Sequence, residues 1–280
     1  MGWMQLLILL GTGTAAGFVA GLAGIGGGVL FTPVLLVYFQ QIGIAPALVP
    51  KLTIGSSLVC TFIAALASAR HQHRQGAVTL RIARWVGASS ALAVTLVTGL
   101  VTTQSWYDAT VFQTVFASLL LILAVRMMTA SAPAPEGDPA RSASASPAPW
   151  QRPALFGIGS AAGAVATAAG VGGGIVLVPA YHRLLHLPIH RAVGTSSATI
   201  VLISAAGMAS YAALGWRADV PATALGYVDA RALLLALPAL GTARLGVWTA
   251  HRLPTRPLRL LFAALAAFVA LRMLYGALLA

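Results

Sequence analysis

Two glycine clusters carry the spacing in this 280-residue chain that points most directly to chemistry. Gly24-Ile25-Gly26-Gly27-Gly28 is followed by Pro33, and Gly170-Val171-Gly172-Gly173-Gly174 is followed by Pro179. Each glycine weakens a helix by about 1 kcal/mol relative to alanine. A helix that breaks there exposes backbone N–H groups and the positive end of its dipole, which can bind an anion without any charged side chain. Tight helix packing in lipid is the alternative use of such glycines.

Hydroxyl side chains form a second candidate set. They are Thr53, Ser56 and Ser57 in the first half of the chain and Thr195, Ser196 and Ser197 in the second. Hydroxyls donate to oxyanions and accept from cations, so they suit a substrate or an ion. Serine and threonine in membrane helices also bond back to the preceding turn. Both interpretations stay open at this point.

Arg244 is the charged residue best placed within an apolar block. An arginine inside the membrane would counter an anionic substrate. His251 and Arg252 follow closely, however, so Arg244 could equally extend to the membrane surface. Lys51 and Arg191 precede the two hydroxyl sets and could attract anions, although surface anchoring explains them as well.

The positions of the acidic residues and histidines argue against proton-coupled transport and against a metal site. We expect Asp108, Glu136, Asp138, Asp219 and Asp229 in loops or at span ends. The apolar centres then lack the carboxylates or histidines on which proton-coupled carriers usually rely. His182, His186 and His190 share a helical spacing, but Pro188 interrupts it and no acidic residue or cysteine is near. We therefore expect no metal, no cofactor and no enzymatic activity.

The composition identifies the elements that must position these residues. Hydrophobic residues make up 59% of the chain and charged residues 8%, whereas globular domains carry about 45–50% and 25%. The net charge of +12 comes from arginines scattered singly, which disfavours nucleic acid as a partner. Cys60 is the single cysteine, so no internal disulfide forms. The chain is predicted to be an all-α polytopic membrane protein in a lipid bilayer.

Two halves of the chain read as repeats. We predict a first membrane repeat over residues 1–129, a Ser/Ala/Pro-rich linker over 130–152 and a second repeat over 153–280, with four apolar blocks in each repeat. The glycine clusters and their prolines share an offset of 146 residues, and the hydroxyl motifs follow with a shift of seven. Internal repeats of this kind are typical of transporters, in which two elements rock about a shared site.

The charge distribution distinguishes two topologies. The block from Leu6 to Phe39 has 34 residues and would form a helix of about 51 Å, too long for one crossing. It therefore forms a broken crossing helix or a re-entrant hairpin. Eight simple crossings place 10 Lys/Arg inside and 6 outside, whereas hairpins at both clusters give 12 and 4. The positive-inside rule favours hairpins, hence inverted repeats with both termini outside.

These motifs resemble the TauE/SafE sulfite-exporter family, also called the 4-toluene sulfonate uptake permeases. The resemblance rests on the duplicated Gly-x-Gly-Gly-Gly with its proline, the Gly-Thr-Ser pair and the stretch from Gly241 to Gly246. It implies a multi-pass transporter of the bacterial inner membrane that moves sulfite, sulfonates or related organosulfur acids.

We therefore expect a secondary transporter whose small anionic substrate lies between the two glycine clusters, with the hydroxyl sets lining the site. The alternatives are a membrane-embedded accessory protein without transport activity and a passive anion channel. A homo-oligomer is left open.

Overall fold

The computed structural model describes residues 3–23, 27–104, 106–129, 152–216, 224–250 and 255–278. Gly24, Gly26 and residues 130–151 of the expected linker lie outside these ranges. The helices of the first half are α1 (Trp3–Ala23), α2 (Gly28–Gln41), α3 (Val49–Arg74), α4 (Leu80–Thr103) and α5 (Ala109–Thr129). The second half holds α7 (Arg152–Ala169), α8 (Gly174–Arg183), α9 (Ile189–Leu214), β1 (Ala224–Leu225), β2 (Val228–Asp229), α10 (Ala232–Ala250) and α11 (Thr255–Leu278). The strands form a two-residue antiparallel ladder.

The long apolar blocks break at their glycines. Gly27 caps the N-terminus of α2 with φ 73°, and Gly173 caps that of α8 with φ 76°. Both caps use the left-handed backbone conformation, which costs an L-residue roughly 1–2 kcal/mol but is open to glycine. The sequence therefore encodes two short helices at each cluster instead of one long helix.

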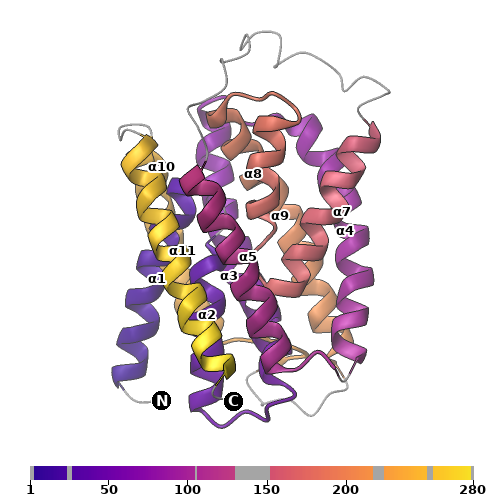
Figure 1. The fold of residues 1–280 in the computed structure, drawn as a ribbon, viewed down its shortest axis with the longest axis vertical. Coiled ribbons are helices and arrows are strands. Elements are labelled where there is room, and N and C mark those ends of the chain that lie inside the picture. Colours follow the sequence, from indigo (N-terminus) through magenta and orange to yellow (C-terminus); the bar gives the residue numbers. More distant parts are fainter. Residues whose placement is uncertain are drawn as a thin grey trace.

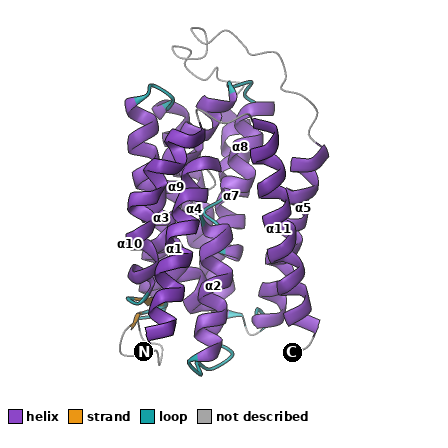
Figure 2. Ribbon diagram, turned by 90° about the vertical axis from the view of Figure 1, so that its left-hand side faces the viewer, coloured by secondary structure: helices purple, strands orange, loops and turns teal. Residues whose placement is uncertain are grey.

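The two broken segments enter the molecule from opposite ends (Figure 1). We call the end with the starts of α1 and α3 the lower end, and the end with the α3–α4 turn the upper end. The segment α1–α2 starts and finishes at the lower end, whereas α7–α8 starts and finishes at the upper end. The start of α1 and the end of α11 both lie at the lower end, on opposite sides of the molecule in Figure 2. Each broken segment is thus a hairpin.

Small residues bring the hairpins against long helices. Gly17 in α1 faces Ala239 in α10, and Gly163 in α7 faces Ser90 in α4, in each case at backbone contact distance. Close backbone approach of this kind is how small residues drive helix association where water is absent. The helices α3 and α9 lie at the centre between these two pairs.

Helix length and composition fit a membrane. Among the described residues, α3, α4, α9 and α10 contain stretches long and apolar enough to cross one. Large apolar side chains such as Trp3, Leu96 and Phe268 are more than 60% exposed on the outside, as lipid contact requires. The all-α membrane fold expected from the composition is confirmed.

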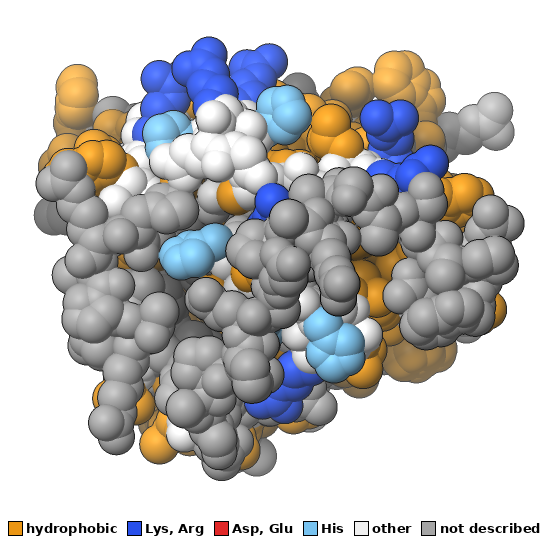
Figure 3. Space-filling model, turned by 90° about the horizontal axis from the view of Figure 1, so that it is seen from above, with side chains coloured by type: hydrophobic (Ala, Val, Ile, Leu, Met, Phe, Trp, Pro, Cys, Tyr) orange, Lys and Arg blue, Asp and Glu red, His pale blue; other side chains and the backbone are white. Residues whose placement is uncertain are grey.

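Arginine side chains gather at the upper end. Arg70 and Arg74 end α3, Arg81 and Arg84 begin α4, and Arg183 ends α8. The view from above shows Lys/Arg and histidine side chains around the rim of this end (Figure 3). The lower end has Lys51 at the start of α3 and Arg231 before α10. The upper end is therefore the more basic one in the described part of the chain.

Candidate anion site at the two helix breaks

The two glycine clusters meet in the interior of the protein. A Cβ placed on Gly28 would lie 2.6 Å from Val171 Cα and 2.7 Å from Gly170 O. Gly28, Gly170 and Val171 are all buried. The start of α2 thus packs directly on the backbone that joins α7 to α8, so residues 142 positions apart in the sequence form one site.

The carbonyl groups at the end of α7 are capped by hydroxyl side chains. Tyr211 Oη donates to Thr167 O at 3.0 Å, and Tyr107 Oη donates to Ala168 O. Burial raises the pKa of Tyr107, so its phenol stays a neutral donor. These bonds satisfy acceptors that an ending helix leaves free.

Gly170 O receives two hydroxyls from the first half of the chain. Ser57 Oγ lies 3.0 Å away and Thr32 Oγ1 lies 3.2 Å away. Ser57 Oγ also lies 2.9 Å from Ile54 O, so one proton serves two carbonyls. The expected site residue Ser57 is therefore at the break. Thr32 was missed because it is a single hydroxyl within the apolar run of α2, directly before Pro33, and no neighbouring polar residue marks it.

The starts of α2 and α8 present hydrogen-bond donors, in contrast to the carbonyl acceptors at the end of α7. Gly27 O accepts from the N–H groups of Leu30 and Phe31, and Gly173 O accepts from those of Val176 and Leu177. The N–H groups nearest each break precede these bonds and have no acceptor within their own helix. Their partial positive charge makes both helix starts suited to a small oxyanion.

Thr53 and Thr61 carry further hydroxyls on α3, one turn before and one turn after Ser57. Both are fully buried, and neither Oγ1 has a hydrogen-bond partner in the described structure. A Cβ on Gly172 would lie 2.6 Å from Thr61 Cγ2, so Thr61 lies against the break itself. Thr53 was among the expected site residues, whereas Thr61 was not. Its spacing of four residues from Ser57, one helical turn, could have identified it.

Three other expected hydroxyls join helices away from the break. Ser56 Oγ accepts from Asp229 N–H at 2.9 Å, and Thr195 Oγ1 accepts from Thr79 N–H at 3.0 Å. Ser197 Oγ lies 3.2 Å from Ser68 Oγ. These residues tie α3 and α9 to the segments before α10 and α4 and to each other. Ser196 is buried on α9 between Thr195 and Ser197.

The cationic candidates lie outside the breaks. Arg244 is exposed on α10, beside Ala243, which packs against Gly21. Lys51 Nζ donates to Thr102 O at 2.8 Å and so caps the C-terminus of α4. Arg191 is half-buried at the start of α9. Positive potential at the breaks therefore comes from backbone amides in the described residues.

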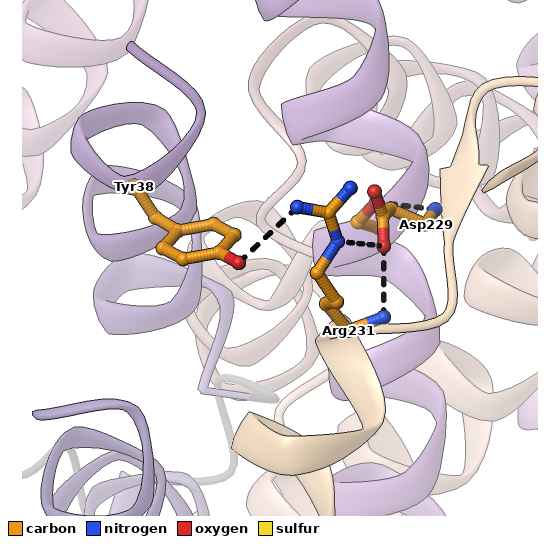
Figure 4. Close-up of polar contacts among 4 residues, drawn as sticks. Tyr38, Asp229 and Arg231 are labelled. Carbon is orange, nitrogen blue, oxygen red and sulfur yellow. Dashed lines mark hydrogen bonds and ion pairs between the residues drawn. The ribbon is translucent and has the colours of Figure 1, made fainter. Parts of the chain in front are cut away.

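A buried ion pair at the lower end was not expected from the sequence. Asp229 is 1% exposed, and Arg231 Nε lies 3.2 Å from its Oδ1 (Figure 4). Arg231 Nη1 donates to Tyr38 Oη at 3.3 Å, which connects the pair to α2. Burial lowers the pKa of Arg231, but Tyr38 and the Asp229 carboxylate outweigh it and hold the pKa above its ordinary value.

Of the five acidic residues, Asp108 and Asp229 are described, and both lie between helices as expected. Asp108 Oδ1 accepts from Val111 N–H at 2.8 Å and caps α5. The described residues contain no group of three or more His, Cys, Asp or Glu placed to hold a metal ion.

Apolar spanning helices, two half-helix hairpins and a buried meeting point of their glycines define a multi-pass membrane transporter. The model of the Sulfite exporter TauE/SafE family matches residues 9–273. The chain belongs to this family.

The names of two relatives agree with this class of protein. A "Probable membrane transporter protein" of Haemophilus influenzae is 28% identical over 270 residues, which cover 96% of this chain and 97% of the relative. A "Probable membrane transporter protein" of Methanocaldococcus jannaschii is 26% identical over 272 residues, covering 97% and 96%. No solved structure matches the chain.

Proposed function

We propose that this protein is a secondary transporter of small sulfur oxyanions, such as sulfite or a sulfonate, in the bacterial inner membrane. The contact of Gly28 with Gly170 and Val171 carries the proposal, because it packs the start of α2 on the buried backbone segment that leads from α7 into α8. The anion lies there between the two helix starts, with Gly27, Gly28, Gly173 and Gly174 presenting backbone amides.

The choice of an anion follows from the groups at the breaks. Carbonyl groups at the end of α7 already receive hydroxyl protons, whereas the helix starts offer N–H groups. A trigonal or tetrahedral oxyanion matches several N–H donors at once. The description of the family as a sulfite exporter supports a sulfur oxyanion as the substrate.

Alternating access follows from an inverted repeat. Matched contacts at opposite ends of the molecule support this arrangement. Ser56 on α3 accepts from Asp229 N–H at the lower end, and Thr195 on α9 accepts from Thr79 N–H at the upper end. Likewise Gly55 packs on Tyr227 O and Gly194 on Ala77 O. Rocking of one half against the other would expose the shared site to each side in turn.

The basic upper end faces the cytoplasm in this proposal. Arg70, Arg74, Arg81, Arg84 and Arg183 lie there, and the positive-inside rule places such residues on the cytoplasmic side. Both termini then face the periplasm.

Flux in proteoliposomes tests the function. The purified protein should take up or release radiolabelled sulfite or a sulfonate saturably. Absence of flux for a panel of sulfur oxyanions would support an accessory protein instead, and flux linear in concentration would support a passive channel.

A double glycine variant tests whether the two helix starts bind the anion. Gly27→Ala with Gly173→Ala places two methyl groups on left-handed residues and should abolish flux. Gly99→Ala is the matched control, because nothing lies within 4 Å of a Cβ at that position of α4. Full activity of the double variant would remove the helix starts from the mechanism.

A further inference from the structure

Polar side chains form a stripe along one buried face of α3. Thr53, Ser57, Thr61, Ser68 and Gln72 are each at most 3% exposed. Successive members are four, four, seven and four residues apart, which places them on one side of a helix with about 3.6 residues per turn. Ala64 and Ala65 fill the interval between Thr61 and Ser68 with small side chains. We call these five residues the α3 polar stripe.

The α3 polar stripe contains buried polar atoms that no protein group satisfies. Thr53 Oγ1, Thr61 Oγ1 and Gln72 Oε1 find no hydrogen-bond partner within the described chain. Burying an unpaired polar atom costs free energy, so native proteins keep such atoms where water or a ligand can reach them. Three of them on one helix face indicate a route for a polar solute.

The corresponding face of α9 keeps one polar side chain, Ser196, and α9 has no buried side-chain N or O atom that lacks a partner. The offset of 139 residues between Gly55 and Gly194 assigns the stripe positions to Ala192, Ser196, Ile200, Gly207 and Tyr211. Ala192, Ile200 and Gly207 carry no polar side-chain atom, and Tyr211 Oη is bonded to Thr167 O. Thr61 and Ile200 both contact Gly172, where a Cβ would lie 2.6 Å and 2.9 Å from their methyl carbons. The route therefore belongs to one half of the molecule.

The two ends of the α3 polar stripe connect the break to the basic upper end. Ser57 bonds to Gly170 O and Thr61 lies against Gly172, and Thr53 begins the stripe one turn before Ser57. Gln72 lies at the other end, between Arg70 and Arg74 in the sequence. Ser68 Oγ lies 3.2 Å from Ser197 Oγ on α9, and Ser197 Oγ also lies 3.1 Å from Val193 O, so Ser68 is the donor of the pair. This bond closes the route between the break and the upper end.

We propose that the α3 polar stripe is the path by which the transported anion passes between the helix breaks and the arginine-rich upper end. Thr61 is the first hydroxyl to bind the anion outside the helix starts. The Ser68–Ser197 hydrogen bond must open for passage, and the Gln72 amide binds the anion at the exit. This inference rests on the proposed transport function.

Isosteric variants test the path in proteoliposomes with sulfite. Thr61→Val removes the hydroxyl at nearly constant volume, and we expect at least a tenfold rise in KM. Gln72→Leu should lower the maximal flux several-fold. Thr98→Val is the control, since Thr98 is equally buried but its Oγ1 is bonded to Val94 O within α4. It should transport like the natural protein.

Charge-selective labelling tests the path without measuring transport. In a Cys60→Ala background, Ser68→Cys and Gln72→Cys are exposed to an anionic methanethiosulfonate that carries a sulfonate, and to its trimethylammonium counterpart. We expect the anionic reagent to react at least tenfold faster at both positions. Gln75→Cys, exposed in the α3–α4 turn, gives the ratio of the two rates set by the basic surface alone, which Ser68→Cys and Gln72→Cys should exceed, and Ser204→Cys, buried on α9, should react with neither reagent.

The transport and labelling results together distinguish failure of the proposed path from failure of the proposed function. Natural protein that transports sulfite, with unchanged KM in Thr61→Val and no preference of the anionic reagent, would overturn the path alone. Selective labelling without flux of any sulfur oxyanion would retain an anion path and overturn the proposed substrate class.

Discussion

Gly28 at the start of α2 packs on the backbone of Val171, so that a Cβ on Gly28 would lie 2.6 Å from Val171 Cα. This contact joins the two halves of the chain at their glycine clusters. The partner atoms belong to the backbone and cannot rotate away as a flexible side chain would. The first half therefore touches the second at the start of α2 and at the segment just before α8, next to the two helix ends that have free amide groups.

Gly28→Ala should separate the two breaks. The added methyl group also meets Gly170 O at 2.7 Å, so α2 must shift. We expect a destabilisation of about 1–3 kcal/mol, as for other overpacked sites, and loss of most flux. Thermal unfolding in detergent and uptake in proteoliposomes measure the two effects. Gly11→Ala on α1, with nothing within 4 Å of its Cβ, should be neutral, and equal behaviour of the two variants would contradict the contact.

Thr32 and Ser57 should show coupled energies because they donate to the same carbonyl. Either hydroxyl alone still satisfies Gly170 O, so Thr32→Val and Ser57→Ala should each cost about 1 kcal/mol. The double variant leaves a buried acceptor unpaired and should cost more than the sum, by about 0.5–3 kcal/mol. A double-mutant cycle by chemical denaturation measures this term. Strict additivity would mean that the two hydroxyls do not share the carbonyl.

The sequence predicted the helix breaks but not the residues that contact them. Three glycines in a row weaken a helix wherever they occur, so Gly27 and Gly173 could be identified from local propensity. Their contacts are long-range: Tyr107 and Tyr211 reach the end of α7 from 61 and 44 residues away. No local pattern encodes such a pairing. The neighbouring residues Ser56 and Ser57 are likewise indistinguishable as candidates in the sequence. Only the tertiary structure shows that Ser57 lies at the break, whereas Ser56 accepts from Asp229 N–H.

Arg231→Gln should destabilise the lower end. It leaves the buried Asp229 carboxylate without the cation that lies 3.2 Å from it. Arg231 is partly exposed, so solvent screening limits the cost to about 1–3 kcal/mol. Tyr38→Phe removes a single hydrogen bond and should cost about 0.5–1.5 kcal/mol. Thermal unfolding ranks the two, with the exposed Arg272→Gln as control. Because Arg231→Gln also removes the bond to Tyr38, an equal cost for the two variants would show that the Tyr38 bond, rather than the ion pair, stabilises this end.

The proposed topology places two exposed turns on opposite sides of the membrane, with the basic upper end in the cytoplasm. In a Cys60→Ala background, Ala45→Cys between α2 and α3 should react with an impermeant maleimide on intact cells. Gln75→Cys between α3 and α4 should react after permeabilisation, since the basic upper end faces the cytoplasm. Labelling of both turns from the same side would exclude α3 as a crossing helix. Labelling in the reversed order would invert the orientation.

The proposed anion site can be tested by direct observation. Selenite has the shape and charge of sulfite, and its selenium scatters anomalously. A crystal structure with selenite should show an anomalous peak within hydrogen-bond reach of the amide groups of Gly173 and Gly174 and of Thr61 Oγ1. A saturating selenite peak elsewhere in the protein, with none between the starts of α2 and α8, would contradict the account.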